Sequence, residues 1–464
     1  MGSRVGIPGR PSGWISHYRK FSGVGHIGLI RAHFLLSGNR LRPIRSMSPG
    51  SRRKGYFMNN KGWDVIYAVR TDLVTKDMQA NMSRFITEFS FSGKLGDRRY
   101  RISGRFRPWS VTNVGSSTMV GVVCPTEGCT MEVTDKDGKV STIPLDGITP
   151  IIQFNLAFLD AEVAQSKVLR FTAFERNAAT DENGDVVVLD ADSTNSVSDA
   201  ALEVLLKDAW HALFWQNRKS LDYIFATVNL VPPGDSSWMA PREMAYHFWN
   251  GAGNNAFLCI LTMTRSCDIG GLDRVPDSDL YTDGDGKDVF VSISPEMLMQ
   301  KMVLPALGGG YSCNGTEITG SKNMSVSNAR YVHVSSIHIR VSGASLPMAY
   351  SGKAGIMTDS TMTFQGKQTR NFAYDNGKIR FRGAKGSFDH QEHLSFWDGL
   401  LTGLTAGIFY GIESAIESGI AGDIENGMGA SFNLSLGAIQ WGTHTTGIGI
   451  DHARMNDALI LQAS

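Results

Sequence analysis

The sequence predicts an α+β fold in which curved antiparallel sheets dominate. Strand-type runs of β-branched and aromatic residues recur along most of the chain, as in residues 65–69, 151–158 and 223–231. Apolar residues at helical spacing form only a few helices. The strands do not alternate regularly with helices, which disfavours a parallel α/β sheet. We therefore expect two sets of one long helix with many strands, in an elongated molecule.

The first predicted elements are the strand at residues 65–69 and a short helix after it. The helix begins near Thr71, because apolar side chains then recur at helical spacing: Val74, Met78, Met82 and Phe85. Residues 88–170 follow as strands joined by turns. They include the alternating run 99–103 and a hairpin-type turn at 135–139.

The middle of the chain contains the clearest helix. It follows a turn at 181–185 and a strand at 186–189, and Ser198 can cap it. Its apolar face comprises Leu202, Leu205, Leu206, Ala209, Leu213 and Phe214. A strand at 223–231 ends at Pro232-Pro233-Gly234. Ser294-Pro295-Glu296 is a typical helix start, and that helix should reach about Pro305.

Long strands then dominate residues 323–382, and a last helix is predicted from about Leu394 to Ser418. Gly399, Gly403, Gly407 and Gly411 recur on it at every fourth position, and Ala415 and Gly419 continue the row. Such a row lets another backbone approach closely. Large apolar residues surround it, so this helix either packs on a curved sheet or contacts lipid. Both interpretations hold if lipid lies between the helix and the sheet.

The composition fits a globular protein with a sizeable core. Hydrophobic residues make up 42% of the 464 residues and charged residues 19%. No run of 18 uncharged apolar residues occurs, so no transmembrane segment is predicted. The five cysteines are too few and too scattered for a disulfide framework, which favours synthesis in a reducing compartment.

Residues 1–57 differ from the rest of the chain. They hold eleven Lys or Arg and no Asp or Glu, whereas the net charge from Met58 onward is −10. We expect these residues to form a disordered basic extension. If translation starts at Met58, they are not native translated sequence. A basic arm that binds nucleic acid or a membrane is the alternative. No signal peptide is predicted, because no A-x-A-like site follows the broken apolar stretch at 24–36. The acidic body disfavours nucleic acid as a partner.

Signatures of catalysis and of metal binding are missing from the sequence. It contains no G-x-S-x-G, H-E-x-x-H or phosphate-binding G-x-x-x-x-G-K-[ST] motif, so we expect no enzyme activity and no cofactor. His390 and His393 could share a helical face and bind a metal, but a polar helix start is the preferred interpretation. Residues 283–288 fail the calcium-loop pattern because Lys287 takes the fifth position, so a solvated turn is expected there.

Two segments resemble the clostridial 47-kDa (P47) and OrfX family, whose genes lie beside those of botulinum neurotoxin and related toxins. The segment Gly62-Trp63-Asp64-Val65-Ile66-Tyr67-Ala68 resembles the family's opening. Residues 223–230, followed by Trp238, Pro241 and Tyr246, resemble its central segment. The length from Met58 to Ser464 also matches.

The resemblance implies a tubular lipid-binding (TULIP) fold of two modules, 58–221 and 222–464, each a long helix wrapped by a highly curved antiparallel sheet. It also implies a protein without catalysis that binds lipids, phosphoinositides among them in some members. Such a protein would be an accessory of a bacterial toxin gene cluster, with toxin or other cluster-encoded proteins as partners. It would be made in the bacterial cytoplasm and released by a non-classical route.

The family supplies no defining ligand residues, so the candidates come from the sequence. The candidate lipid-binding residues are apolar positions of two predicted helices: Val74, Met78, Phe396, Trp397, Leu400, Leu404 and Ile408. Each acyl CH₂ that they bury would contribute about 0.8 kcal/mol. Arg99, Arg101 and Arg105 could face one way on a strand and bind a phosphoinositide headgroup, although a solvated sheet face is the simpler interpretation. The alternative function is a protein-binding scaffold or toxin-complex component that has lost lipid binding.

Overall fold

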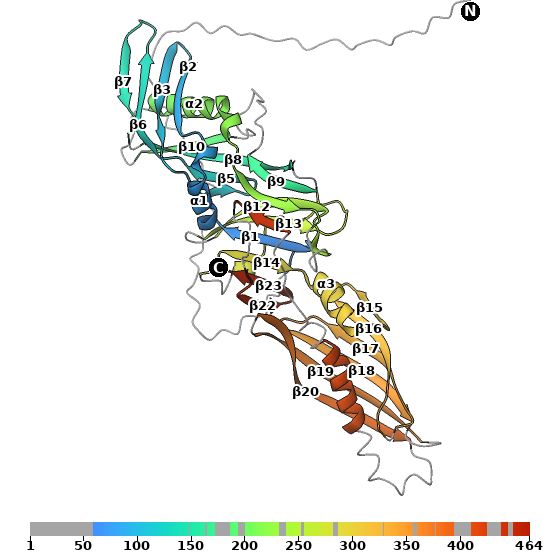
Figure 1. Ribbon diagram of the computed structural model, residues 1–464. Helices are drawn as coiled ribbons and strands as arrows, with labels where there is room; N and C mark the ends of the chain where they lie inside the picture. Colours follow the sequence, from blue (N-terminus) through green and yellow to red (C-terminus); the bar gives the residue numbers. More distant parts are fainter. Residues whose placement is uncertain are drawn as a thin grey trace, which may run out of the picture. The chain divides into compact units, whose positions relative to one another are not determined.

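The structure is a computed structural model, and the residues that it describes all lie within one compact unit, Gly55–Ser464. They are 59–146, 148–162, 165–171, 186–193, 200–231, 238–251, 255–281, 286–327, 329–355, 360–375, 377–393, 410–424, 438–443 and 449–464. Every strand pair within them is antiparallel, as the sequence predicts, and strands far outnumber helices (Figure 1).

A central six-stranded sheet contains the first predicted strand. Its order is β12 (Glu243–Asn250), β13 (Ala256–Met263), β1 (Val65–Arg70), β14 (Val289–Ile293), β23 (Ala458–Ala463) and β22 (His452–Asn456). Tyr67 of β1 lies opposite Ile260 on one side and Val291 on the other. The sheet therefore takes strands from both sides of residue 221, the expected module boundary.

A seven-stranded sheet contains the two longest predicted β runs of the first half. Its order is β21 (Ile439–Trp441), β11 (Ile224–Asn229), β9 (Ser166–Phe171), β8 (Ile148–Asp160), β5 (Met119–Val123) and β4 (Ser110–Ser116), and β10 (Val186–Ser193) also pairs with β8. Here β11 again joins a strand from the end of the chain, β21, to strands of the first half.

A four-stranded sheet carries the arginine-rich strand. It consists of β2 (Glu88–Leu95), β3 (Arg98–Phe106), β6 (Thr126–Thr134) and β7 (Val140–Pro144). The turn between β6 and β7 lies where the sequence predicts a hairpin. Asp135 accepts hydrogen bonds from the backbone N–H groups of Asp137 and Lys139, and Gly138 supplies the positive φ of the turn.

A six-stranded meander forms a curled half barrel in the last third of the chain (Figure 1). Its strands are β15 (Tyr311–Asn314), β16 (Glu317–Met324), β17 (Tyr331–Arg340), β18 (Ser345–Gly355), β19 (Thr361–Asp375) and β20 (Lys378–His393). Register shifts at Val334/Ser336 and Lys367/Thr369 interrupt the ladders. Bulges of this kind increase strand twist and bend the sheet.

The predicted metal-site residues lie on a strand, so the helical interpretation of residues 389–393 is wrong. Strand β20 continues to His393, which pairs with Thr361 of β19. Side chains alternate faces along a strand, so His390 and His393 point to opposite sides of the sheet. Among the described residues, no group of three or more His, Cys, Asp or Glu side chains could hold a metal ion.

Two predicted helices are confirmed in the first half of the chain. Helix α1 (Thr71–Ala80) ends before Met82, which begins a 3₁₀ turn, and Phe85 is extended. Helix α2 (Ala200–Gln216) buries Leu205, Leu206, Ala209, Leu213 and Phe214 as expected. It also buries Trp210, which packs in an aromatic cluster with Phe89, Phe106 and Phe214.

The third predicted helix begins and ends as expected but is not uniform. The Ser294 side chain caps it, and it comprises α3 (Pro295–Leu298), a π-helical turn (Met299–Val303) and α4 (Leu304–Leu307). Pro305 lacks an N–H and its ring clashes with the carbonyl four residues earlier, which accounts for the wider turn before it. Gly308, with φ 74°, ends the helix.

The last predicted helix is described only from Tyr410 onward. Residues 410–424 are helical and include a π-helical turn at Glu417–Ala421. The predicted start at Leu394 lies outside the described residues, as do Gly399, Gly403 and Gly407. No helix among the described residues is long and apolar enough to cross a membrane.

Candidate functional site

The two described lipid candidates of the first half lie in the core. Val74 and Met78 occupy the buried face of α1 and belong to the main hydrophobic cluster. Neither residue lies on a surface that a ligand could reach without a change in packing. The other five lipid candidates, Phe396, Trp397, Leu400, Leu404 and Ile408, lie outside the described residues.

Asp77, which lies between Val74 and Met78 on α1, connects three parts of the chain. Its carboxylate accepts hydrogen bonds from the Tyr223 hydroxyl at 2.5 Å and from the backbone N–H and hydroxyl of Thr443. Gly442, with φ 55°, lies against this carboxylate so closely that a Cβ would overlap it. Burial and the Asp77 hydrogen bond raise the pKa of Tyr223. We interpret this junction as structural.

The best candidate for an apolar site is the interface between residues 410–424 and the half barrel. Ile412, Ile416, Ile420 and Ile424 recur at every fourth position and are at most 1% exposed. On the sheet, one face is likewise apolar and buried, with Val332, Val334, Ile337, Ile339, Leu346, Met348, Met362, Phe364, Ile379 and Phe381. Together they form a continuous apolar layer between one helix and one curved sheet.

Two glycines of this helix lie against side chains of β16 and of the residues just after it, whereas the glycine row predicted the close approach of another backbone. A Cβ on Gly411 would lie 2.8 Å from Val326 Cγ1, and one on Gly419 would lie 2.7 Å from Met324 Cε. The Lys322 ammonium lies 2.6 Å from the Asp423 carboxylate and fixes the end of the helix beside β16. The isoleucine row was missed in the sequence, although its four-residue spacing is visible there.

The three candidate arginines share one face of β3, as the sequence predicts. Arg99, Arg101 and Arg105 are exposed, whereas Tyr100, Ile102 and Phe106 are buried on the other face. Glutamates of neighbouring strands share the arginine face. Arg105 Nε lies 3.3 Å from the Glu88 carboxylate, and Glu127 and Glu132 are cross-strand partners of Arg105 and Arg101. The glutamates therefore offset part of the positive charge of the arginines. Arg99 differs from the other two, because its cross-strand neighbours are Lys94 and Thr134.

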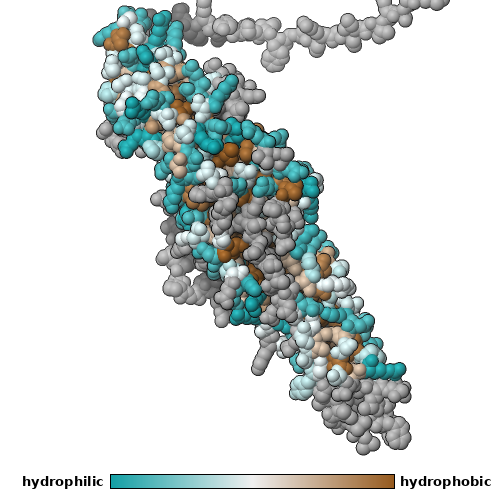
Figure 2. Space-filling view, in the orientation of Figure 1, coloured by the Kyte–Doolittle hydropathy of each residue, from teal (hydrophilic) through white to brown (hydrophobic). Residues whose placement is uncertain are grey.

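Three hollows on the described surface are lined largely by polar and charged groups. One of about 600 Å³ lies beside Glu88, Arg105 and Glu127. Two more, of about 650 and 500 Å³, share Ser351, Gln365 and Asp389 on the half barrel. The visible face of the molecule is mainly hydrophilic, with separate small hydrophobic spots (Figure 2).

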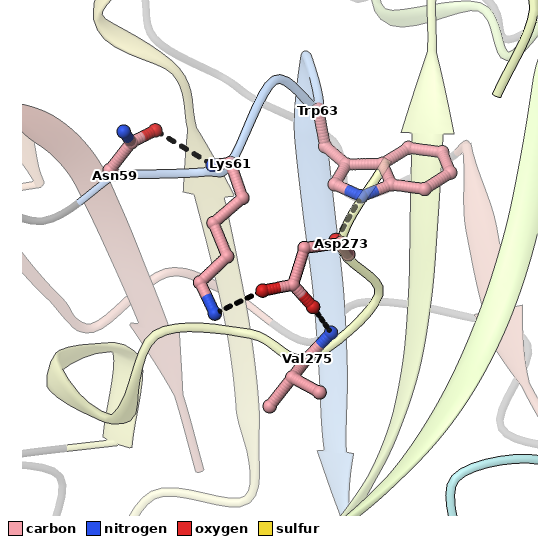
Figure 3. Close-up of polar contacts among 5 residues, drawn as sticks. All are labelled: Asn59, Lys61, Trp63, Asp273 and Val275. Atoms are coloured by element: carbon pink, nitrogen blue, oxygen red, sulfur yellow. Dashed lines mark hydrogen bonds and ion pairs between the residues drawn. The ribbon is translucent and has the colours of Figure 1, made fainter. Parts of the chain in front are cut away.

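The Gly62-Trp63-Asp64 segment fastens a long loop onto the central sheet (Figure 3). We call this loop, residues 264–281, the strap. The Trp63 indole Nε1 donates to the Asp273 carbonyl at 2.8 Å, and Lys61 Nζ lies 2.7 Å from the Asp273 carboxylate. The Asp64 carboxylate accepts from the backbone N–H and the hydroxyl of Thr264, each at 2.8 Å. These contacts give the segment a structural role.

The strap covers one apolar face of the central sheet. The covered residues form a second hydrophobic cluster, which comprises Trp63, Ile66, Ala68, Ala245, Phe257, Cys259, Leu261, Met263, Phe290, Ala458 and Ile460. Leu280 of the strap is fully buried against them, and the Tyr281 ring stacks on Phe257 with 4.1 Å between centroids. Burial raises the pKa of the Cys259 thiol to about 12.

Comparison with known proteins gives consistent matches. The OrfX-like family model, described as Protein OrfX2/OrfX3/P47, matches residues 60–341. Protein P47 of Clostridium botulinum (strain Kyoto / Type A2) is 26% identical over 249 residues, which are 53% of this chain and 56% of that protein. The sequence match thus spans little more than half the length of the curated relative.

Two solved structures share the fold. The structure of P47 from Clostridium botulinum A2 has a TM-score of 0.71 at 19% identity and covers 88% of this chain and 98% of that chain. The structure of P47 of Clostridium botulinum E1 has a TM-score of 0.69 at 19% identity, covering 87% and 99%. At these identities the similarity establishes the fold.

Proposed function

The chain belongs to the OrfX-like family of OrfX2, OrfX3 and P47 proteins, and from this premise we propose that it is a non-enzymatic lipid-binding protein. The observation that carries the proposal is the apolar layer between helical residues 410–424 and the half barrel β15–β20. Both surfaces are apolar along their length. An acyl chain between them would have to separate the helix from the sheet, and apolar contacts with the chain would replace those that are lost.

The row of isoleucines supports this assignment because of its shape. Ile412, Ile416, Ile420 and Ile424 present a continuous aliphatic ridge without a hydrogen-bonding group. Such a ridge can slide along an acyl chain without leaving a polar atom unpaired. The affinity would come from the number of CH₂ groups buried, at about 0.8 kcal/mol each, rather than from a specific recognition motif.

Photo-crosslinking tests the location of the lipid. The purified full chain would be loaded with a fatty acid that carries a diazirine on its acyl chain, irradiated and digested. We expect the label on peptides from residues 410–424 and from β17–β20. Absence of labelling, or labelling confined to other elements, would contradict the proposal.

A matched pair of variants separates lipid binding from helix stability. Ile416→Asn places an amide in the apolar layer, whereas Ser414→Asn places the same group on the exposed side of the same helix. We expect Ile416→Asn to lose the lipid that co-purifies in native mass spectrometry and Ser414→Asn to keep it. Thermal unfolding of both variants identifies any loss that is due to misfolding.

For a phosphoinositide headgroup, we propose Arg99 and Arg101 as the contacts, with Lys94 beside Arg99. Arg105 is the weaker candidate because Glu88 already pairs with it. In flotation with vesicles that contain a phosphoinositide, Arg99→Gln should reduce binding more than Arg105→Gln. Equal binding by the wild type and both variants would remove this headgroup site.

The alternative function is a protein-binding scaffold of a toxin complex, and the polar hollows on the half barrel favour it. They are lined by hydrogen-bonding side chains from four neighbouring strands, which suits a polar protein surface. A chain that carries no lipid in native mass spectrometry, ignores liposomes and binds a cluster-encoded protein would support this alternative. Sequencing of the genes beside its own tests the proposed link to a toxin cluster.

A further inference from the structure

The strap covers a histidine as well as apolar residues. His247 lies on β12, on the same face as Ala245 and Trp249, and it is 5% exposed. Its Nδ1 has no hydrogen-bond partner within the described part of the chain. A buried ring nitrogen without a partner is unusual in a folded protein and marks a place where protonation would be unfavourable.

The charged groups around His247 come from two elements. The strap contributes Asp273 and Arg274, and the segment before β1 contributes Lys61. The cross-strand neighbour on β13 is the uncharged thiol of Cys259. The Asp273 carboxylate is already bound by Lys61 Nζ at 2.7 Å and by the Val275 backbone N–H at 2.9 Å. A positive charge on His247 would therefore lie near two cations, Lys61 and Arg274, and near one carboxylate, Asp273, which Lys61 already binds.

We propose that the strap is a pH-sensitive cover that is released when His247 becomes protonated. Release hydrates the imidazolium and uncovers the apolar face that contains Trp63, Ile66, Phe257, Leu261, Phe290 and Ile460. The inference rests on the geometry of the cover and is independent of the proposed lipid site on the half barrel.

The direction of the pH dependence follows from the burial of His247. Burial lowers the pKa of His247 to about 4; Asp273 opposes this shift, and Arg274 and Lys61 add to it. In the open state the ring is hydrated and has its ordinary pKa of about 6.5. The open state therefore binds more protons between these two values, so the closed state loses stability as the pH falls through this window.

The size of the effect can be stated as an equilibrium. The equilibrium constant for opening of the strap rises by up to about tenfold for each unit by which the pH falls. Between pH 7.5 and pH 5 the total rise is roughly 30-fold. Hydrogen bonding to Lys61 lowers the pKa of Asp273, so this carboxylate stays ionised across the window. The pH dependence of strap opening is therefore assigned to His247.

Hydrogen exchange of the full chain tests the proposal, with rates corrected for the intrinsic effect of pH. We expect the protection of residues 264–281 to fall roughly 30-fold from pH 7.5 to pH 5 in the wild type. His247→Asn should reduce that fall to less than about threefold. His338→Asn, which removes an exposed histidine of β17, should leave it unchanged.

Three outcomes would overturn the proposal: constant protection of the strap in the wild type, the same fall in His247→Asn, or an equal fall across β17–β20. The last would mean global unfolding. If His247→Asn does not fold, His247→Gln provides the same comparison, and the wild-type profile alone can contradict the proposal. Binding of the dye ANS should increase below pH 6 in parallel with strap exchange and reverse at pH 7.5.

Discussion

The indole Nε1 of Trp63 donates a hydrogen bond to the backbone carbonyl of Asp273, at 2.8 Å and across 210 residues of sequence (Figure 3). The indole ring is almost fully buried, and Gly62 beside it has φ 92°, where a Cβ would lie 3.0 Å from Leu272 Cδ2. A residue of the family's opening segment thus holds the strap in place. The segment that carries the resemblance is an anchor for another part of the chain.

Removal of this hydrogen bond should destabilise the protein measurably. Trp63→Phe keeps an aromatic ring but loses the donor and part of the volume, so we expect a loss of about 1–3 kcal/mol in the free energy of unfolding. Lys61→Met removes the partly exposed ion pair to the same residue and should lose less than about 1 kcal/mol. Urea unfolding measures both. An equal loss in the two variants would show that the indole hydrogen bond is unimportant.

Gly442 should tolerate no side chain. Gly442→Ala introduces a Cβ that overlaps the Asp77 carboxylate at a residue with φ 55°. The matched control is Gly377→Ala, which also has a positive φ but no atom within 4 Å of the added Cβ. We expect a loss of about 1 kcal/mol for the control and at least about 2 kcal/mol more for Gly442→Ala. Similar melting temperatures for the two variants would contradict the tight contact with Asp77.

The two hydrogen-bonded tyrosines should differ in importance. Tyr223→Phe removes a buried 2.5 Å hydrogen bond to Asp77 and leaves that carboxylate with one donor fewer. Tyr100→Phe removes a partly buried hydrogen bond of 2.8 Å to Asp208. We expect losses of about 1.5–3 kcal/mol for Tyr223→Phe and below about 1 kcal/mol for Tyr100→Phe. The reverse order in chemical denaturation would show that the Asp77 junction is not a structural centre.

All five cysteines have free thiols. We expect two classes of reactivity among them, because some thiols are buried and others are partly exposed. Burial raises the pKa of Cys129 and Cys259 to about 12 and that of Cys124 well above its ordinary value. Cys267 and Cys313 are partly exposed, and burial raises the pKa of Cys313 as well. At pH 8 a thiol reagent should therefore modify Cys267 first and Cys313 more slowly, and the other three cysteines only on unfolding. Fast modification of Cys259 would show that the strap does not cover it.

Local patterns in the sequence predicted much of the fold. The strand at 65–69, the helix after Thr71, the face of α2 and the Ser294 cap all depend on neighbours within a few residues. Strand β20 was missed beyond residue 382 because its last part pairs with Thr361–Lys367 of β19, and such pairing is not local. The chain there is polar, which resembled a helix start when taken alone.

The candidate site was predicted less well, for the same reason. Alternation along β3 correctly placed Arg99, Arg101 and Arg105 on one face. The glutamates that share that face lie on β2 and β6, and register cannot be derived from one strand. The strap and His247 gave no signal at all, because the sequence does not show that residues 61, 247 and 273 come near one another in the fold.

The position of β1 in the middle of its sheet has a consequence for synthesis. β1 is among the first parts of this sheet to leave the ribosome, yet both of its neighbours, β13 and β14, are translated only after residue 255. Until then the chain exposes a run, Val65-Ile66-Tyr67-Ala68-Val69, that is fully buried in the finished protein. Unpaired β-prone apolar segments of this kind drive aggregation of nascent chains. A chaperone bound to the nascent chain during that interval should therefore raise the yield of folded protein.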